Sequence, residues 1–301
     1  MAITLSAINL KKAVTSALDD YRNKPFHFIS DYVAPVVNVP ERTGYMPKFT
    51  NEHMKLQDFS VSLDGKAHKV DIGTSSTSFT CVDHSAEFHL TKRMMVSDST
   101  GLLKAANIST RVDEGIRLQR ENEVATVLTG LSSSTPGIKW DLAGGSPPTD
   151  IATYQGTMFS SINRLPRHGL CSYDVGLKLR ALCGQAYGRQ TSDLPSMEEV
   201  AKWMGLDEIR MGLASYDSGK PGKSTTFATL LGTKAFWLFY KPETMDSSLP
   251  AFMATTRFAA LSQPRVYPLL QPEGFGVEVN DCYDVVSVDT NACIHLANVL
   301  K

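Results

Sequence analysis

The sequence has no long apolar segment and nothing that resembles a leader for secretion. Its longest strongly apolar run, Ala235 to Tyr240, is far shorter than the ~20 residues that a helix needs to cross a bilayer. Lys11 and Lys12 follow the first apolar residues, whereas the basic residues of a secretory signal precede its apolar block. These absences predict a soluble protein that is not secreted and has no membrane contact.

Net charge is also almost absent, and cysteines are few. The 30 basic and 31 acidic residues leave a formal charge of −1 and a pI near 6.7. No net field therefore draws the protein to nucleic acid or anionic lipid, and any contact with a genome should be weak. The cysteines are odd in number, widely spaced and without a CxxC pair, which predicts reduced thiols in a cytoplasm. They are Cys81, Cys171, Cys183, Cys282 and Cys293.

What the sequence does contain is enough apolar material for a large core and a mixture of helical and strand patterns. At ~150 residues per domain, 301 residues correspond to about two compact units, and 42% of them are apolar. An amphipathic N-terminal helix is predicted by the apolar spacing of Leu10, Val14, Leu18 and Tyr21. The patterns together indicate an α+β protein.

Residues 24–49 contain four prolines and many apolar side chains. The prolines are Pro25, Pro35, Pro40 and Pro47, each of which removes a backbone donor. Such a segment is expected to be extended and unable to bury itself, so that it packs on something else as an arm. The alternative is an ordinary irregular connection, although about 25 residues exceed the usual loop length.

An alternating pattern follows at residues 57–73, with Asp64 and Gly65 at the turn of a predicted β-hairpin. A Ser/Thr-rich stretch at 74–80 leads into a second alternating run at Ala86, Phe88 and Leu90. The region to about residue 95 therefore resembles a two-stranded projection. A ribbon of this kind is marginally stable in water, so we expect it to rest on a neighbour.

The most regular helix is predicted over Ser109 to Leu128. A narrow apolar stripe on it includes Val112, Ile116 and Val124. The charged residues around this stripe are Arg111, Asp113, Glu114, Arg117, Arg120, Glu121 and Glu123. On the sequence alone a solvated face is the simpler interpretation, and mixed charges at helical spacing would also suit a neighbouring subunit.

Further elements are predicted after this helix. A helix is expected over Asp150 to Ile162, and residues 165–264 are typical of an α/β unit. Ser196 and Glu199 have the spacing of a capping box, and Gly205 suits the left-handed position after a short helix. Strands are predicted at 208–213 and at 235–240, the latter buried on both faces, and residues 275–300 are mostly strand.

Two groups of residues could carry chemistry, and each falls short. The loop 219–224 ends like a phosphate-binding loop, but Asp217 stands where that motif needs glycine, and its carboxylate would repel phosphate. Cys81, His84 and His89 could bind metal with Asp83 and Glu87, but strand alternation places the two histidines on opposite faces. We therefore assign no catalytic, cofactor or metal residue and expect no enzyme.

Several segments, in their order along the chain, resemble successive segments of one known fold. ISDYVAPVVNVPERTGYMPKF (29–49) is similar to the segment by which the chain enters the fold, and RENEVATVL (120–128) to the end of the spine helix. IKWDLAGGSPPTDIATY (138–154) resembles the passage after that helix, and LPSMEEVAKWMGLDEIRMGLASYDS (194–218) a later helix-glycine-strand segment. Phe236 to Pro242 is similar to the strand that ends in Y-x-P. In this order the segments resemble the Hong Kong 97-type capsid fold of tailed-bacteriophage major capsid proteins.

The resemblance implies an N-terminal arm (1–50), an extended β-hairpin loop (51–97), a peripheral domain with a long spine helix (98–164 and 265–301) and an axial domain (165–264). It implies that identical chains assemble into hexamers and pentamers, forming an icosahedral shell around double-stranded DNA. The protein would then be made and assembled in the host cytoplasm and located in the virion. Scaffolding, portal and decoration proteins are implied partners, with a separate scaffold, or none, expected rather than a fused one.

Subunit contacts are expected where the chain has surfaces without an internal partner. The interface residues predicted on this basis are Asp64, Gly65, Lys66, Arg111, Glu114, Arg117, Arg120 and Glu121. Two alternatives remain open. One is an encapsulin-type nanocompartment shell, which shares the fold and encloses an enzyme. The other is a cytoplasmic hydrolase or nucleotide-binding enzyme that uses the loop 219–224.

Overall fold

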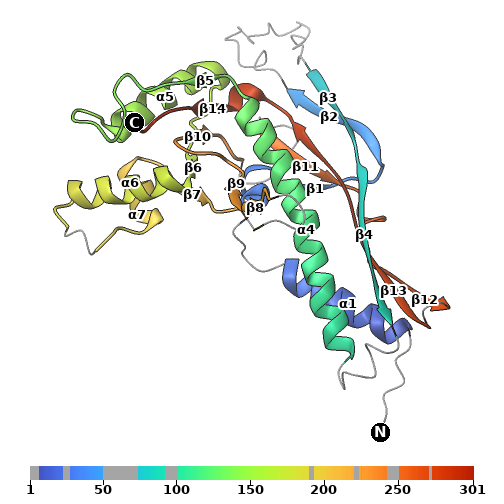
Figure 1. Cartoon of the computed structure of the whole chain (residues 1–301). Coiled ribbons are helices and arrows are strands. Elements are labelled where there is room, and N and C mark those ends of the chain that lie inside the picture. The colour runs from blue at the N-terminus through green and yellow to red at the C-terminus, as the bar shows by residue number, and fades with distance from the viewer. Residues whose placement is uncertain are drawn as a thin grey trace, which may run out of the picture.

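The chain folds into two five-stranded sheets joined by one long helix, as predicted for an α+β protein (Figure 1). The computed structural model describes residues 7–22, 28–49, 74–91, 101–189, 193–219, 224, 226–242, 251–270 and 273–301. In these residues no helix is long and apolar enough to span a membrane.

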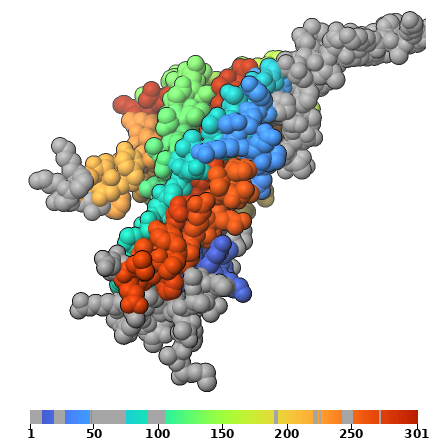
Figure 2. Space-filling view, turned by 90° about the vertical axis from the view of Figure 1, so that its right-hand side faces the viewer, coloured from blue at the N-terminus to red at the C-terminus, as the bar shows by residue number. Residues whose placement is uncertain are grey.

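The first sheet is long and is organised around one strand. Its strands are β1 (Val36–Asn38), β4 (Val82–Thr91), β11 (Met253–Arg257), β12 (Arg265–Leu270) and β13 (Glu273–Ser287). β13 pairs antiparallel with β4, β11 and β12, and β11 pairs parallel with β1. Segments from the two ends of the sequence therefore lie side by side, as the blue, cyan and orange regions of Figure 2 show.

Two helices lie along this sheet. The long helix α4 (Gly101–Gly130) contacts β4 and β13, and α1 (Ala7–Arg22) contacts α4 and β12. Leu10, Val14 and Leu18 of α1 are buried in a core shared with α4 and β13, which confirms the predicted N-terminal helix. α4 is also confirmed, and it extends beyond both predicted ends.

The second sheet is mixed and is covered by the shorter helices. Its strand order is β5 (Ser133–Ser134), β14 (Cys293–Leu296), β10 (Phe236–Phe239), β6 (His168–Ser172) and β7 (Glu208–Gly212). The neighbouring helices are α5 (Pro147–Ile162), α6 (Tyr173–Ala186), α7 (Met197–Trp203) and the 3-10 turn η2 (Thr290–Ala292). β7 lies at the edge of this sheet.

Local signals in this region predicted the structure well. Every residue of β10 is buried, as expected for a strand covered on both faces. The capping box is present, since the Glu199 N–H donates to Ser196 Oγ at 3.3 Å and the Ser196 N–H donates to Glu199 Oε2 at 2.9 Å. Gly205 has φ +71°, where an L side chain would be strained.

The predicted two-stranded projection is corrected in part. β2 (Thr43–Phe49) and β3 (Thr74–Thr80) form a two-stranded ribbon, but β4 is a member of the first sheet and pairs with β13 over ten residues. Leu90 of β4 is fully buried. The predicted hairpin at 57–73, including Asp64, Gly65 and Lys66, lies outside the described residues.

The expectation that residues 24–49 cannot bury themselves is wrong for the described part of this segment. It forms the short helix α2 (Ser30–Val33) and then β1, which adds to the first sheet. Ile29, Tyr32 and Val33 belong to a core that also contains residues of α4, α5, β6, β10 and β11. These apolar side chains, which lie between the prolines of this segment, therefore pack in the core of their own chain, and not on a neighbour.

The predicted domain boundaries at 50, 97, 164 and 264 stay a prediction. The strands of each sheet come from more than one of the predicted ranges. β11 falls in the range assigned to the axial domain but pairs in the first sheet. β14 falls in the range assigned to the peripheral domain but pairs with β10 in the second. The chain thus passes between the two sheets more often than the predicted boundaries imply.

Trp237 links the second sheet to the end of α4. Its side chain is fully buried, and its indole N–H donates to the carbonyl of Leu128 at 3.0 Å. This carbonyl is one of the last four of the helix, and these carbonyls receive no hydrogen bond from an N–H of the same helix. The indole therefore satisfies a buried helix end and joins two elements of the fold.

Substitution Trp237→Phe should remove this hydrogen bond and leave a buried carbonyl without a donor. We expect the free energy of unfolding to fall by about 2 kcal/mol, measured by urea denaturation followed by circular dichroism. Trp203→Phe is the matched control, since Trp203 is only partly buried, at the margin of the apolar cluster that includes Val200 and Met204. An equal or smaller loss in Trp237→Phe than in the control would contradict this role.

Candidate subunit-contact surfaces

Glu121 of α4 binds the start of α2. Its carboxylate is 1% exposed and accepts hydrogen bonds from the Ile29 N–H at 2.9 and 3.0 Å and from the Ser30 N–H at 2.7 Å. These N–H groups precede or begin a helix and have no acceptor within it. The side chain therefore fixes a segment that lies about 90 residues away in the sequence.

Burial raises the pKa of the Glu121 carboxyl to about 6, against the opposing effect of the Ile29 and Ser30 N–H groups and of the Arg120 charge. Arg120 is itself 4% exposed, and its Nη2 lies 2.6 Å from Oδ1 of Asp31 on α2. Two adjacent residues of α4 thus contact the same short helix. One binds its backbone, and the other binds its side chain.

The premise that the charges of this helix lack partners within the chain is wrong for these residues. Glu121 and Arg120 are buried and bonded to α2, and Arg117 is buried with Asp113 at 3.5 Å. Arg111 and Glu114 differ, because they form a pair at 3.7 Å on the exposed side of the helix. A contact with a neighbouring subunit stays a prediction for the whole set, and the exposed pair is the part that could make one.

Tyr32 was not singled out from the sequence, yet it occupies the junction between α2 and the second sheet. Its hydroxyl lies 3.2 Å from the carbonyls of Gly169 and Glu208, on β6 and β7. The Arg210 guanidinium lies 4.5 Å from the ring centroid and the Lys241 ammonium 4.9 Å, in the range of cation–π contacts. Burial raises the pKa of the Tyr32 hydroxyl well above its ordinary value, so Tyr32 is a neutral donor here.

The ribbon β2–β3 is attached to the body near both of its described ends. Lys48 of β2 lies 2.8 Å from the buried Asp289, and Arg42 lies 3.0 Å from Asp83. Phe79 of β3 packs in a small cluster with Cys81 and residues of β13. Phe49, the last residue of β2, pairs with Thr74, the first residue of β3, so residues 50–73 follow one strand in the sequence and precede its paired neighbour.

The residues considered for metal or phosphate binding have other roles. Cys81 is buried, and His84 stacks on Tyr283 with ring centroids 4.2 Å apart. Among the described residues no three His, Cys, Asp or Glu side chains come together as a metal site. The five cysteines are free and buried, as predicted for unpaired thiols.

The loop considered for nucleotides has the wrong context. A phosphate-binding loop leads into a helix, whereas the described residues after this loop form the strand β9 (Phe227–Thr229), which pairs with β8 (Ser215–Asp217). Asp217 Oδ1 accepts hydrogen bonds from the N–H groups of Gly219 and Thr226, each at 2.9 Å. These bonds lower the pKa of Asp217 and hold its negative charge at the end of the hairpin.

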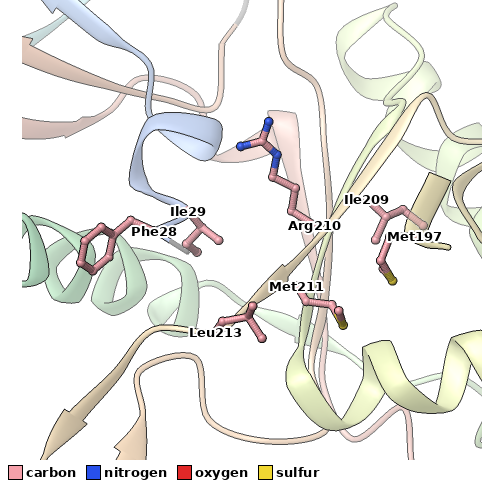
Figure 3. Close-up of a pocket in the computed structure, with 7 residues that line it drawn as sticks. All are labelled: Phe28, Ile29, Met197, Ile209, Arg210, Met211 and Leu213. Atoms are coloured by element: carbon pink, nitrogen blue, oxygen red, sulfur yellow. The ribbon is translucent and has the colours of Figure 1, made fainter. Parts of the chain in front are cut away.

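An open groove lies where the segment before α2 faces the edge of the second sheet (Figure 3). Its volume is about 240 Å³. The lining is apolar apart from one cation, and it consists of Phe28, Ile29, Met197, Ile209, Arg210, Met211 and Leu213. Since β7 is the edge strand, this groove runs along the side of the sheet that has no further strand in the described structure.

Known structures share this architecture, although the sequence itself has no match. No protein-family model matches the chain, and no curated protein is similar to it in sequence. A phage-related protein from Bordetella bronchiseptica is similar at a TM-score of 0.73, with 17% identity over 99% of this chain and 98% of that one.

Two assembled shells are also similar. The capsid of Myoviridae phage XM1 has a TM-score of 0.53 at 13% identity, over 91% of this chain and 93% of that one. The encapsulin of Synechococcus elongatus has a TM-score of 0.54 at 11% identity, over 93% and 90%. At such identities the likeness shows the fold, and the predicted Hong Kong 97-type capsid fold is confirmed.

The contact between Glu121 and α2 predicts a specific pH dependence. The folded-state pKa of about 6 lies above the ordinary value of 4.5, so the folded chain takes up this proton more readily than the unfolded chain does. Protonation of Glu121 should therefore raise the free energy of unfolding as the pH falls through 6, and this gain should be lost as the pH rises through 6 again. Between pH 7.5 and 5 we expect wild type to gain about 1 kcal/mol relative to Glu121→Gln.

Chemical denaturation of both proteins across this pH range is the measurement, and the exposed Glu114→Gln on the same helix is the control. Taking the difference between wild type and variant removes the effect of histidines such as His168, whose pKa is lowered by burial and whose contribution has the opposite sign. A difference that does not change with pH, or that grows as the pH rises, would contradict the assignment.

Proposed function

We propose that this chain is the major capsid protein of a tailed bacteriophage, which assembles into the hexamers and pentamers of an icosahedral shell around double-stranded DNA. The observation that carries the proposal is the extent of the structural likeness. The similar phage-related protein and the capsid of phage XM1 are matched over more than nine tenths of both chains. The whole chain, rather than one module of it, is thus accounted for by a shell subunit.

The surfaces of the molecule support a role in contact. The ribbon β2–β3 contacts the body through Lys48 and Phe79, whereas Tyr45 on it is 74% exposed. At the far end of the first sheet Leu270, the last residue of β12, is 91% exposed. Exposed apolar side chains of this kind are stabilised when another protein covers them.

The charge balance fits the same role. A formal charge of −1 gives weak, non-specific contact with packaged DNA, so cohesion of the shell would come from contacts between subunits. Scaffolding, portal and decoration proteins are proposed partners, and assembly would take place in the host cytoplasm before the chain becomes part of the virion.

An encapsulin-type compartment is the second candidate, because the encapsulin of Synechococcus elongatus has a similar structure. The TM-score of 0.73 to the phage-related protein supports the phage assignment, whereas the capsid of phage XM1, at 0.53, is no more similar to this chain than the encapsulin at 0.54. The two candidates differ in what the particle encloses. The shell of a phage contains DNA, and a nanocompartment contains an enzyme.

Electron microscopy of the purified chain, with and without a co-expressed scaffold, tests the proposal. We expect ring-shaped capsomers or closed shells, because one repeated head-to-tail contact generates closed rings. A chain that stays monomeric under every condition would overturn the proposal. Closed particles that contain an enzyme and no DNA would favour the compartment instead.

A shortened ribbon tests which part of the chain makes the shell. Because Phe49 pairs with Thr74, deletion of residues 51–72 leaves Thr50 and Gly73 as a two-residue turn between the paired strands. We expect a folded monomer with an unchanged circular dichroism spectrum that no longer forms shells. Normal shells from this variant, imaged beside the wild type, would show that the deleted residues make no essential contact.

A further inference from the structure

The hairpin β8–β9 carries an apolar side chain that its own chain does not cover. All three residues of β8 are exposed, and Phe227 of β9 is 72% exposed. Two strands alone are at best marginally stable in water. The only described sheet partner of each of these strands is the other, so the hairpin gains stability when its aromatic face is buried elsewhere.

A carboxylate lies beside this ring. Asp217 and Phe227 are directly opposite each other in the antiparallel pair, so both side chains lie on the same face, about 5 Å apart at their Cβ atoms. Both hydrogen bonds of Asp217 described above fall on Oδ1 and come from backbone groups, which fixes the orientation of the carboxylate without neutralising it. The hairpin therefore presents an aromatic ring together with a negative charge.

The groove beside β7 has the matching properties. Phe28, Met211 and Leu213 provide an apolar lining, and Arg210 provides a positive charge next to it (Figure 3). Arg210 is about half exposed and donates from Nε to Glu208 at 2.6 Å, and its other N–H groups can bind a second carboxylate. A cavity of about 150 Å³ is sufficient for benzene, so about 240 Å³ is sufficient for a phenyl ring.

We infer that Phe227 of one copy inserts into the groove of the next copy, with Asp217 beside the neighbour's Arg210. Phe227 is too exposed to occupy the groove of its own chain. The hairpin β8–β9 and the groove are different surfaces of one molecule, so the contact between two copies is heterologous. Repetition of such a contact either closes a ring or continues as an open chain. The inference rests on the proposed function and identifies one of the contacts by which the subunits would join.

Two single variants each remove one half of this contact. Phe227→Ala removes the ring and keeps the groove, while Leu213→Glu blocks the groove with a charge that repels Asp217 and keeps the hairpin. We expect each to need a protein concentration higher by about tenfold or more for assembly, measured by light scattering and electron microscopy. Phe159→Ala, at an exposed phenylalanine of α5, is the matched control and should assemble like wild type.

Mixing the two variants gives a sharper test. The hairpin of a Leu213→Glu copy can enter the groove of a Phe227→Ala copy, but no second contact of this kind can follow. At a concentration where each variant alone is monomeric, a 1:1 mixture should therefore form dimers on size exclusion with light scattering. A mixture that stays monomeric would overturn the inference.

Further outcomes separate this inference from the proposed function. If wild type forms shells and Phe227→Ala does so at the same concentration, the inference is wrong and the capsid assignment stands. If Leu213→Glu lowers the melting temperature of the monomer and leaves assembly unchanged, the groove is covered by its own chain, and the inference is again wrong. Failure of wild type to assemble under any condition would overturn both.

Discussion

The rest of the structure depends on how residues 29–38 are held between α4 and the two sheets. Glu121 binds the backbone at Ile29 and Ser30, and from there the chain reaches both sheets within a few residues. The Tyr32 hydroxyl donates to a carbonyl of the second sheet. The Ala34 carbonyl accepts a hydrogen bond from the Thr255 hydroxyl at 3.0 Å, next to the point where β1 begins to pair with β11 in the first sheet. One short segment thus fixes the helix and both sheets relative to one another.

Burying a carboxylate requires compensation, because removing an ion from water has a high free-energy cost. Glu121 obtains it from two backbone donors and the neighbouring Arg120, and these contacts do not fully offset the burial, as its raised pKa indicates. The compensation is specific to one geometry. A well-packed apolar side chain at this position could contribute as much stability, but it could not fix the register of α2 on α4.

Local patterns in the sequence were sufficient for those elements whose evidence is local. The capping box at Ser196 and Glu199 needs only four residues, and the apolar run of β10 is visible without a partner. The charged residues of α4 were different, because Arg120 and Glu121 bind a segment about 90 residues away. Nothing in the helix itself distinguishes these buried charges from the exposed Arg111 and Glu114.

The same limit applies to strands and to the candidate contact surfaces. Alternation at 86–90 predicted a strand, but its partner β13 lies nearly 200 residues later, so a ribbon and a sheet member could not be told apart. Tyr32 and the groove beside β7 became visible only once distant elements were brought together. Order along the chain, carried by the resemblance to a known fold, supplied the long-range information that pattern and spacing lack.

The pairing of β4 with β13 also has a mechanical consequence. The ten residue pairs between them run in one continuous register. A tensile force along these strands loads the hydrogen bonds of the ladder together, in shear, whereas a force across them would peel the pairs apart one at a time. In the shell proposed above, each subunit would therefore resist tension best along the direction of this ladder.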